Sequence, residues 1–261
     1  MRHDGPEEEP AARGYAVTHP AGTVVLPQGP GWDQLILAAG GVMTVETPDG
    51  LWVLPPHRAA WVPAGVEHRL VMSGTVRLRT LYLAAGLAAL PPACRVVDVS
   101  PLVRELVLHA VRVAPLWRDV PEHARLLGVL ADQFVVLPDA PLQLPLPSSP
   151  VARAVANALL ADPAHAGDVA ALARAAGASR RTVERLFARE VGMPVGAWRQ
   201  RLRLVTALRL LAAGHTTTEV ALAVGYATPS AFAAMFRTAM HTTPRQWSAA
   251  SPPPPPRPHH P

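Results

Sequence analysis

The spacing of apolar residues changes once along this chain of 261 residues, and that change constrains the fold more than any other feature. Up to about residue 98, short apolar runs alternate with glycine and proline, which is typical of strands joined by turns. From about residue 100 onward, apolar residues recur every three or four positions, as along one face of a helix. Residues 138–150 (PDAPLQLPLPSSP) contain five prolines and cannot form a helix interior. We therefore predict two domains joined by a proline-rich linker over residues 138–150.

The first part is predicted to be an all-β domain over residues 15–98, preceded by a disordered N-terminus of residues 1–14. The tripeptide Pro48-Asp49-Gly50 is a hairpin signal between two apolar runs. In the last run, Arg77 and Arg79 alternate with apolar residues, which predicts a half-exposed strand with both arginines facing water. A small antiparallel barrel or sandwich is the expected result. The predicted strands are residues 23–26, 34–38, 42–46, 51–54, 59–62, 66–72 and 76–83.

Two later segments are predicted to be helical. Residues 99–137 have helical spacing broken near residues 115–121, so two helices are expected there. Residues 151–250 are predicted to form an all-α domain, followed by a disordered proline-rich tail of residues 251–261. The uncharged stretch over residues 80–94 has 15 residues including two prolines, and a membrane-spanning helix needs about 20 apolar residues. The acidic N-terminus does not resemble a signal peptide, so we expect a cytoplasmic protein with no membrane partner.

The charges are distributed unevenly along the chain, and all 24 basic residues are arginine. Residues 1–150 have 11 Arg against 14 Asp and Glu, whereas residues 151–261 have 13 Arg against five acidic residues. The net charge is therefore −3 in the first part and +8 in the second. This asymmetry favours a polyanion as the partner of the second part, with a membrane surface or a merely solvated face as alternatives.

The basic part contains a short helix, a glycine turn and a second helix. Asp168 starts the short helix, Gly177 ends it, and Ser179 is placed to cap the second helix. The apolar residues of the second helix are spaced to face a core, which leaves its arginines outside. This arrangement predicts a helix-turn-helix whose second helix enters the major groove, although any amphipathic helix also presents arginines to water.

A second unit of the same pattern follows. Residues 218–224 are predicted to form a short helix, Gly225-Tyr226 a turn, and Thr228-Pro229 the start of a helix that ends near Met240. One helix, from about residue 195 to residue 213, separates the two units. Two such units are spaced to address successive major-groove faces, about 34 Å apart.

Both units resemble the arabinose-regulator (AraC) family of bacterial transcription factors, over about residues 152–248. The resemblance implies that the first recognition helix places Arg181, Glu184 and Arg185 at base edges. Arginine can bind two guanine acceptors, and a carboxylate can accept a hydrogen bond from a cytosine amino group. The matching positions are Ser179-Arg-Arg-Thr, Arg185-Leu-Phe, Trp198, Arg203-Leu, Glu219-Val-Ala, Gly225-Tyr226, Ser230-Ala-Phe, Phe236-Arg237 and Thr243-Pro244.

In the second recognition helix the resemblance implies base-facing positions at Ser230, Ala231 and Ala234. This chain has Ala233 and Ala234 where family members often have Ser and Arg, so we expect base reading to be concentrated in the first motif. The second motif would contribute thymine-methyl contacts and shape recognition. His241 stands where the family usually has glycine, which leaves the geometry of that helix end open. Phosphate contacts are expected from Arg180, Thr182, Arg189, Thr228 and Arg237.

In the β-rich part, residues 63–68 (PAGVEH) resemble the second sequence motif of cupin barrels, PxGxxH. Both histidines of the first cupin motif are missing, and Gln34 replaces its carboxylate, so neither a metal nor catalysis is expected. His68 is then either a hydrogen-bonded structural histidine or a polar anchor of an effector pocket. In the second case Gln34 lies near it, and Trp52 and Trp61 line the pocket. The tryptophans have the alternative of being core residues.

The sequence therefore predicts a transcription factor with an all-β, cupin-like sensor domain, following helices at residues 99–137 that mediate dimer contacts, and an all-α DNA-binding domain with two helix-turn-helix motifs. Its expected partners are double-stranded DNA, an unidentified small-molecule effector and a second copy of the chain, with RNA polymerase as a further candidate. No cofactor and no enzymatic activity are expected. The alternatives are a cupin-type enzyme with an appended DNA-binding domain and a DNA-binding protein of low sequence specificity.

Overall fold

The computed structural model describes residues 9–26, 31–56, 58–86, 92–135, 143–165 and 167–250. Its strands are β1 (Ala12–His19), β2 (Val24–Val25), β3 (Trp32–Thr47), β4 (Gly50–Leu54), β5 (Arg58–Val62), β6 (Arg69–Ala84), β7 (Arg95–Asp98) and β8 (Gln143–Pro145). Its helices are α1 (Pro101–Val113), α2 (Pro121–Val135), α3 (Pro150–Ala161), α4 (Val169–Ala175), α5 (Arg180–Val191), α6 (Val195–Ala212), α7 (Thr217–Ala223), α8 (Pro229–Met240) and α9 (Pro244–Ala250).

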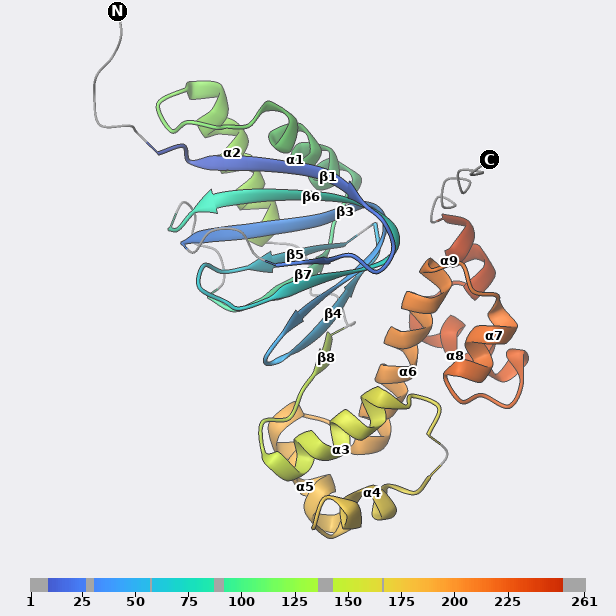
Figure 1. Cartoon of the computed structure of the whole chain (residues 1–261). Coiled ribbons are helices and arrows are strands. Elements are labelled where there is room, and N and C mark those ends of the chain that lie inside the picture. The colour runs from blue at the N-terminus through green and yellow to red at the C-terminus, as the bar shows by residue number, and fades with distance from the viewer. Residues whose placement is uncertain are drawn as a thin grey trace, which may run out of the picture.

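The strands with α1 and α2 form a sheet domain, and α3–α9 form a helical domain (Figure 1). The two domains agree with the change in apolar spacing along the sequence. The predicted disorder of residues 1–8 and 251–261, and the first five residues of the predicted linker, lie outside the described residues. No helix of the described segments is long and apolar enough to cross a membrane.

The strands form one antiparallel sheet with the order β1-β6-β3-β4-β8. In addition, β2 pairs with β6, and β5 pairs with both β3 and β7. The long strand β3 changes partners along its length, since residues 34–37 pair with β5 and residues 43–47 pair with β4. The sheet is therefore strongly curved, as Figure 1 shows.

Two of the long strands correct the sequence prediction of separate short ones. Predicted strands 34–38 and 42–46 are both parts of β3, and most of 66–72 joins 76–83 in β6. The glycines between them bend the strand without ending it: Gly41 has a φ of 78° and Gly74 a φ of 82°. A Cβ atom on Gly41 would collide with the carbonyl oxygen of Thr75. These glycines allow bulges and close backbone approach inside continuous strands.

Strand β1 corrects the predicted disorder of residues 1–14, because it begins at Ala12 and pairs with β6. Ala12 also exchanges two backbone hydrogen bonds with Leu116, with N···O distances of 3.2 and 2.9 Å. The strand lies at one edge of the sheet, and several of its side chains, including those of Arg13 and Thr18, are exposed. An edge strand with few apolar residues has a weak sequence pattern, so its position is set by pairing with β6.

Both faces of the sheet are covered, which explains the continuous apolar runs. Along β3, Leu35 and Leu37 pack with α1 and α2, whereas Ile36 and Ala38 face the interior of the curved sheet. Successive side chains of a strand point to opposite faces, so a strand buried on both sides is apolar at every position.

Arg77 and Arg79 are not simply solvated, contrary to the prediction. Arg77 donates a hydrogen bond from Nη2 to the carbonyl oxygen of Ala39 at 3.1 Å. Arg79 donates from Nη1 to the carbonyl oxygens of Leu78, at 2.7 Å, and Val17, at 3.4 Å. Farther along β6, Leu81 is buried against the helices. Both arginines therefore bind carbonyl groups of the sheet, although Arg77 remains exposed.

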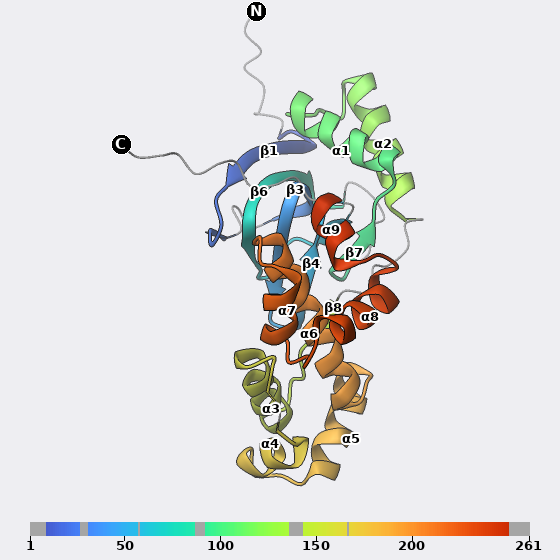
Figure 2. The same ribbon diagram turned by 90° about the vertical axis from the view of Figure 1, so that its right-hand side faces the viewer.

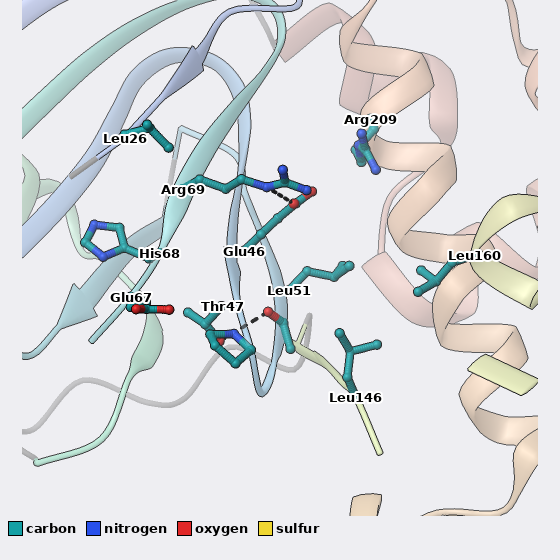
Figure 3. A pocket seen from close by; sticks show the side chains of 12 residues that line it. Leu26, Glu46, Thr47, Leu51, Glu67, His68, Arg69, Leu146, Leu160 and Arg209 are labelled. Atoms are coloured by element: carbon teal, nitrogen blue, oxygen red, sulfur yellow. Dashed lines mark hydrogen bonds and ion pairs between the residues drawn. The ribbon is translucent and has the colours of Figure 1, made fainter. Parts of the chain in front are cut away.

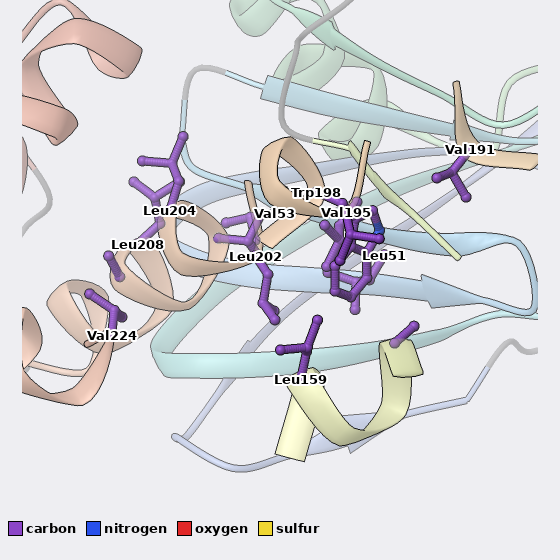
Figure 4. Packing of buried hydrophobic residues seen from close by; sticks show 14 of the residues in the cluster. Leu51, Val53, Leu159, Val191, Val195, Trp198, Leu202, Leu204, Leu208 and Val224 are labelled. Atoms are coloured by element: carbon purple, nitrogen blue, oxygen red, sulfur yellow. The ribbon is translucent and has the colours of Figure 1, made fainter. Parts of the chain in front are cut away.

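A third apolar cluster joins the two domains. Val42, Leu51, Val53 and Leu144 of the sheet domain belong to the same cluster as the helices of the second domain (Figure 4). Helix α6 lies against β3, β4, β6 and β8. The approach is close, because a Cβ atom on Gly74 would lie 2.6 Å from the carbonyl oxygen of Ala212 in α6.

The predicted linker is bound to both domains over residues 143–149, which we call the linking segment. It contains β8, which pairs with β4, so these residues of the predicted linker form a strand of the sheet. Trp198 of α6 donates from Nε1 to the carbonyl oxygen of Pro145 at 2.6 Å. Glu190 at the end of α5 accepts hydrogen bonds from the backbone N–H groups of Ser148 and Ser149, both at 3.0 Å. These contacts use the free backbone groups that proline-rich sequence leaves unpaired.

Replacing Glu190 tests this attachment. The hydrogen bond from the Ser149 backbone, with those from Arg189 and Ser148, lowers the pKa of Glu190 to about 2. We expect Glu190→Gln to lower the free energy of unfolding by about 1.5 kcal/mol at pH 7, the scale of hydrogen bonds to a charged group. Because folding lowers this pKa, the stabilisation is complete above the unfolded pKa of about 4.3 and is lost as the pH falls toward 2.

Denaturant unfolding of the parent and the variant at pH 7 and pH 3 measures this effect, and the difference between them should be smaller at pH 3. Glu105→Gln is the matched control, because Glu105 is exposed on α1 and its carboxylate contacts the neighbouring Arg104. Equal losses in the two variants, or a loss in Glu190→Gln that does not change with pH, would contradict the attachment.

Candidate nucleic-acid interface

The first helix pair, α4 and α5, is fixed by its caps and by its buried face. The Asp168 carboxylate accepts a hydrogen bond from the Ala170 N–H at 3.2 Å, and the Ser179 hydroxyl accepts one from the Thr182 N–H at 3.1 Å. Gly177, with a φ of 73°, makes the turn between the helices. Phe187 of α5 is fully buried edge-on against Trp198, with ring centroids 5.6 Å apart. This packing sets the rotation of α5 and therefore decides which side chains face outward.

Arg181 and Arg185 lie one turn apart on the outer face of α5, and both are exposed. Within the described part of the chain, no hydrogen bond or ion pair engages either guanidinium. Two unpaired guanidinium groups on one helical face can bind a row of acceptors such as guanine O6 and N7.

The other predicted contacts of α5 have partners within the protein. Arg180 lies 3.7 Å from the carboxylate of Asp168 and 4.0 Å from that of Glu184. Arg189 donates to Glu190 at 2.8 Å. The Thr182 hydroxyl lies 2.9 Å from the Ser179 hydroxyl at the start of the helix. Both arginines remain exposed, with side-chain exposures of 61%, so their guanidinium groups can still reach a phosphate.

Glu184 differs from the arginines because its carboxylate has a structural partner. Its Oε2 accepts a hydrogen bond from the Val195 N–H at 3.2 Å, at the first residue of α6, and its side chain is 33% exposed. A carboxylate at a helix N-terminus satisfies a free N–H group and interacts favourably with the helix dipole. The structure thus gives Glu184 a capping role that competes with the predicted base contact.

The second helix pair, α7 and α8, begins with a capping box. Thr216 and Glu219 exchange hydrogen bonds, and those from Thr216 lower the pKa of Glu219. The turn at Gly225 has a φ of 78°, and a Cβ atom there would lie 2.8 Å from Nη2 of Arg203. Arg203 of α6 stacks over the Tyr226 ring, with 5.5 Å between its Cζ and the ring centroid. Arg203 and Gly225-Tyr226, which are among the positions that match the family, therefore form one contact between α6 and this turn.

The outer face of α8 carries few polar groups. The predicted base-facing residues Ser230, Ala231 and Ala234 are all exposed, and Ala233 is half-buried. Thr228 caps the helix by accepting a hydrogen bond from the Ala231 N–H at 3.2 Å. Arg237, one turn before the helix end, is exposed and has no ion pair within the described residues. Helix α8 thus presents methyl groups, one serine and one free guanidinium.

The backbone conformation at the end of α8 shows how a histidine is accommodated at position 241. This residue has a φ of 54° in the left-handed conformation, and its N–H donates to the Arg237 carbonyl at 2.9 Å. Histidine tolerates this conformation better than most residues that have a side chain. The position therefore keeps the backbone geometry that a glycine would give.

The predicted sensor residues are only partly brought together. Nδ1 of His68 lies 2.8 Å from the Val66 carbonyl, so it donates, and Nε2 lies 3.3 Å from the Gln34 side-chain oxygen. Burial lowers the pKa of His68, which favours the neutral ring over the charged one. In a neutral ring that donates from Nδ1, Nε2 is an acceptor. A hydrogen bond between Nε2 and Gln34 therefore requires the side-chain NH2 group of Gln34 to face the ring.

The two tryptophans lie on opposite faces of the sheet. Trp52 belongs to the cluster inside the curved sheet. Trp61 packs with α1 and α2, with its ring centroid 5.8 Å from that of Phe134. Gln34, Trp52, Trp61 and His68 therefore do not line one cavity, because strand alternation sends Trp61 away from the other three. Within the described residues, no three His, Cys, Asp or Glu side chains are placed to hold a metal ion.

Sequence reasoning missed a cavity between the domains. It has a volume of about 550 Å³ and is lined by His68 together with residues of the β3–β4 hairpin, the linking segment, α3 and α6 (Figure 3). These residues are distant in sequence and have no motif in common, so no local pattern could have shown the cavity.

Residues 172–250, which include both helix pairs, match a family model described as a helix-turn-helix domain. The HTH-type transcriptional regulator NimR of Escherichia coli (strain K12) is 34% identical over 216 residues, which are 83% of this chain and 79% of that protein.

Solved structures are also similar. A transcriptional regulator with an AraC-type DNA-binding domain from Chromobacterium violaceum is 26% identical over 41% of this chain and 96% of its own, with a TM-score of 0.38. ToxT from Vibrio cholerae O395 is 8% identical over 92% of this chain and 98% of its own, with a TM-score of 0.40.

The extent of the similarity to NimR, which runs through both domains, agrees with the motif positions in the helical domain. The chain belongs to the AraC family of DNA-binding transcriptional regulators.

Proposed function

We propose that this regulator binds a specific DNA sequence, reads its bases mainly with α5, and responds to a small-molecule effector. The proposal rests on Arg181 and Arg185, which are exposed and have no protein partner among the described residues. They lie on a helix whose inner face is held in place by the buried side chain of Phe187. A free guanidinium needs no internal contact to be broken before it binds a base.

Helix α8 contributes in a different way. Its methyl groups at Ala231 and Ala234 suit contact with thymine methyl groups, and Ser230 can donate or accept one hydrogen bond. Phosphate contacts from Arg180, Thr182, Arg189, Thr228 and Arg237 would set affinity and orientation without reading sequence. The apolar face of α8 also supports the second candidate function, a DNA-binding protein of low specificity.

A second copy of the chain is the partner proposed for α1 and α2. These helices carry exposed apolar side chains, Leu102 at 57% exposure, Val129 at 45% and Val113 at 38%. Burying them in a dimer would remove apolar surface from water. Contact with RNA polymerase and a cytoplasmic location stay predictions from the sequence.

Alanine variants of the two free arginines test base reading. A binding-site selection with the parent protein first identifies the preferred sequence. We expect Arg181→Ala and Arg185→Ala each to weaken binding to it by about 1–3 kcal/mol and to relax the preference at one base position. Fluorescence anisotropy at fixed salt measures the affinity. Arg13→Ala, at an exposed arginine on β1 outside the proposed dimer surface, is the control. Unchanged affinity in both variants would contradict the assignment, and a selection without a preferred site would favour the low-specificity function.

Arg237→Ala should affect binding differently. A phosphate contact is lost equally on every sequence, so affinity should fall on preferred and random DNA alike. The slope of log affinity against log salt concentration should decrease by about 1. Titrations at several salt concentrations on both DNAs measure this. A loss confined to the preferred sequence would show instead that Arg237 contacts a base.

The Glu184→Ala variant distinguishes a capping role of Glu184 from a base-reading role. We expect it to lower the free energy of unfolding by about 1 kcal/mol, since the Val195 N–H loses its acceptor. The selected DNA sequence should not change. Thermal unfolding and a repeated site selection measure the two effects. An altered preference at one position with unchanged stability would return Glu184 to the base-reading set.

A further inference from the structure

The two recognition helices lie in separate parts of the helical domain. Helix α5 packs against α3, α4 and α6, whereas α8 packs against α7 and α9. The first helix pair and α3 lie near one end of α6, and the second helix pair lies near the other end (Figures 1 and 2). Helix α6 connects the two pairs along the chain. The angle at which the second pair is held on α6 depends on the side chains between them.

Arg203 of α6 contacts two chain segments at once. Its Nε donates a hydrogen bond at 3.3 Å to the carbonyl oxygen of Pro163, which lies in residues 162–165 between α3 and α4. Its guanidinium also lies over the ring of Tyr226 in the turn before α8, with 5.5 Å between Cζ and the ring centroid. A planar guanidinium can donate in its plane while its face stacks on a ring, and a lysine ammonium cannot combine the two contacts in this way.

The two segments also meet each other beside Arg203. A Cβ atom on Gly225 would lie 2.8 Å from Nη2 of Arg203, 2.9 Å from the carbonyl oxygen of Ala164 and 3.0 Å from the Cα of Ala164. The turn therefore has no room for a side chain against residues 162–165, and only glycine permits this approach. The chain that leads into the first helix pair and the turn inside the second pair are thus packed together at Arg203.

Aromatic packing connects the Tyr226 ring to α8. The ring centroids of Tyr226 and Phe232 are 5.9 Å apart, and those of Phe232 and Phe236 are 5.7 Å apart. Phe232 and Phe236 are fully buried and form the inner face of α8. A rotation of α8 would disturb this row of rings, so the outward direction of Arg237 depends on where Tyr226 is held.

We propose that Arg203 is a positioning residue for DNA recognition, which holds α8 in place relative to α5 by joining residues 162–165 to the turn at Tyr226. The proposal rests on the proposed function, because it requires both recognition helices to contact DNA. Arg203 itself faces these two segments and acts through Tyr226.

A fixed second helix pair strengthens the DNA contacts of α8. When α8 is ordered before DNA binds, less conformational entropy is lost on binding, and its contacts contribute more to affinity. A second pair that can change its angle on α6 would lose part of this contribution. Helix α5 would keep its own contribution, because Phe187 packs it against Trp198 at the other end of α6.

A double-mutant cycle on the full chain tests this role, because it measures coupling to α8 separately from a general loss of stability. Arg203→Met keeps a long unbranched side chain and removes the guanidinium. Fluorescence anisotropy at fixed salt measures DNA affinity. The loss of affinity caused by Arg237→Ala should be smaller by about threefold or more in the Arg203→Met background than in the parent. The loss caused by Arg185→Ala should be the same in both backgrounds.

Arg201→Met is the matched control. Arg201 is a half-buried arginine of the same helix, and it donates at 3.1 Å to the carbonyl oxygen of Gln143 in the linking segment. Its replacement should leave the Arg237→Ala loss as it is in the parent. The positioning role would be overturned if Arg203→Met did not reduce the Arg237→Ala loss, if Arg201→Met reduced it equally, or if the Arg185→Ala loss fell by the same factor.

Two variants of Tyr226 decide the question if Arg203→Met does not fold. Tyr226→Leu removes the ring on which Arg203 stacks and should reduce the Arg237→Ala loss as Arg203→Met does. Tyr226→Phe keeps the ring and should behave as the parent does. Equal results for the two variants would overturn the role of the stacking contact.

The proposed function and the positioning role fail in different ways. A site selection that yields no preferred sequence refutes sequence-specific binding, and the cycle can then still be measured on random DNA. A preferred sequence without coupling between Arg203 and Arg237 refutes the positioning role alone. Unchanged affinity in Arg237→Ala itself would overturn the contact of α8 with DNA, and the positioning role with it.

Discussion

The side chain of Trp198 connects the parts on which the rest of the structure depends. It is fully buried, packs edge-on against Phe187 of α5, and donates its indole N–H to the Pro145 carbonyl of the linking segment. One residue thus packs α5 against α6 and ties the sheet domain to both. An indole suits this position because it buries a large apolar area while its single donor satisfies a proline-flanked carbonyl. Its loss would remove a contact that contributes both to the outward direction of Arg181 and to the packing of the two domains.

Folding gives some arginines of this lysine-free chain partners within the protein and leaves others without them. Arg203 is used inside the helical domain, where it stacks on Tyr226 and donates to the Pro163 carbonyl at 3.3 Å. Arg77 and Arg79 serve carbonyl groups of the sheet. Arg181, Arg185 and Arg237 have no such partner among the described residues, and they lie on α5 and α8. The net charge of +8 therefore overstates the charge available to DNA, and local pairing decides which part of it is available.

The parts of the fold that the sequence predicted are those specified by neighbouring residues. The cap at Ser179, the turn at Gly177 and the spacing of Val183 and Phe187 are local, and together they predicted α4, α5 and the outward arginines. The missed parts depend on distant pairing. Strand β1 is ordered by β6, and β8 is ordered by β4 and by α6, so their own residues carry little pattern. The same holds for Glu184, whose acceptor role appears only when α6 begins beside it, and for Trp61, whose direction depends on the register of β5.

Helix α6 connects the sheet domain with both helix pairs through one rigid element. Near its start, Trp198 contacts α5; one turn later, Arg203 contacts the turn before α8; and Arg209 faces the cavity. A regular helix transmits displacement along its axis with little change of shape, so a change in how α6 lies against the sheet would also move α5 and α8. A ligand can act through α6 only if it has different affinities for two positions of this helix, and the coupling energy cannot exceed that difference.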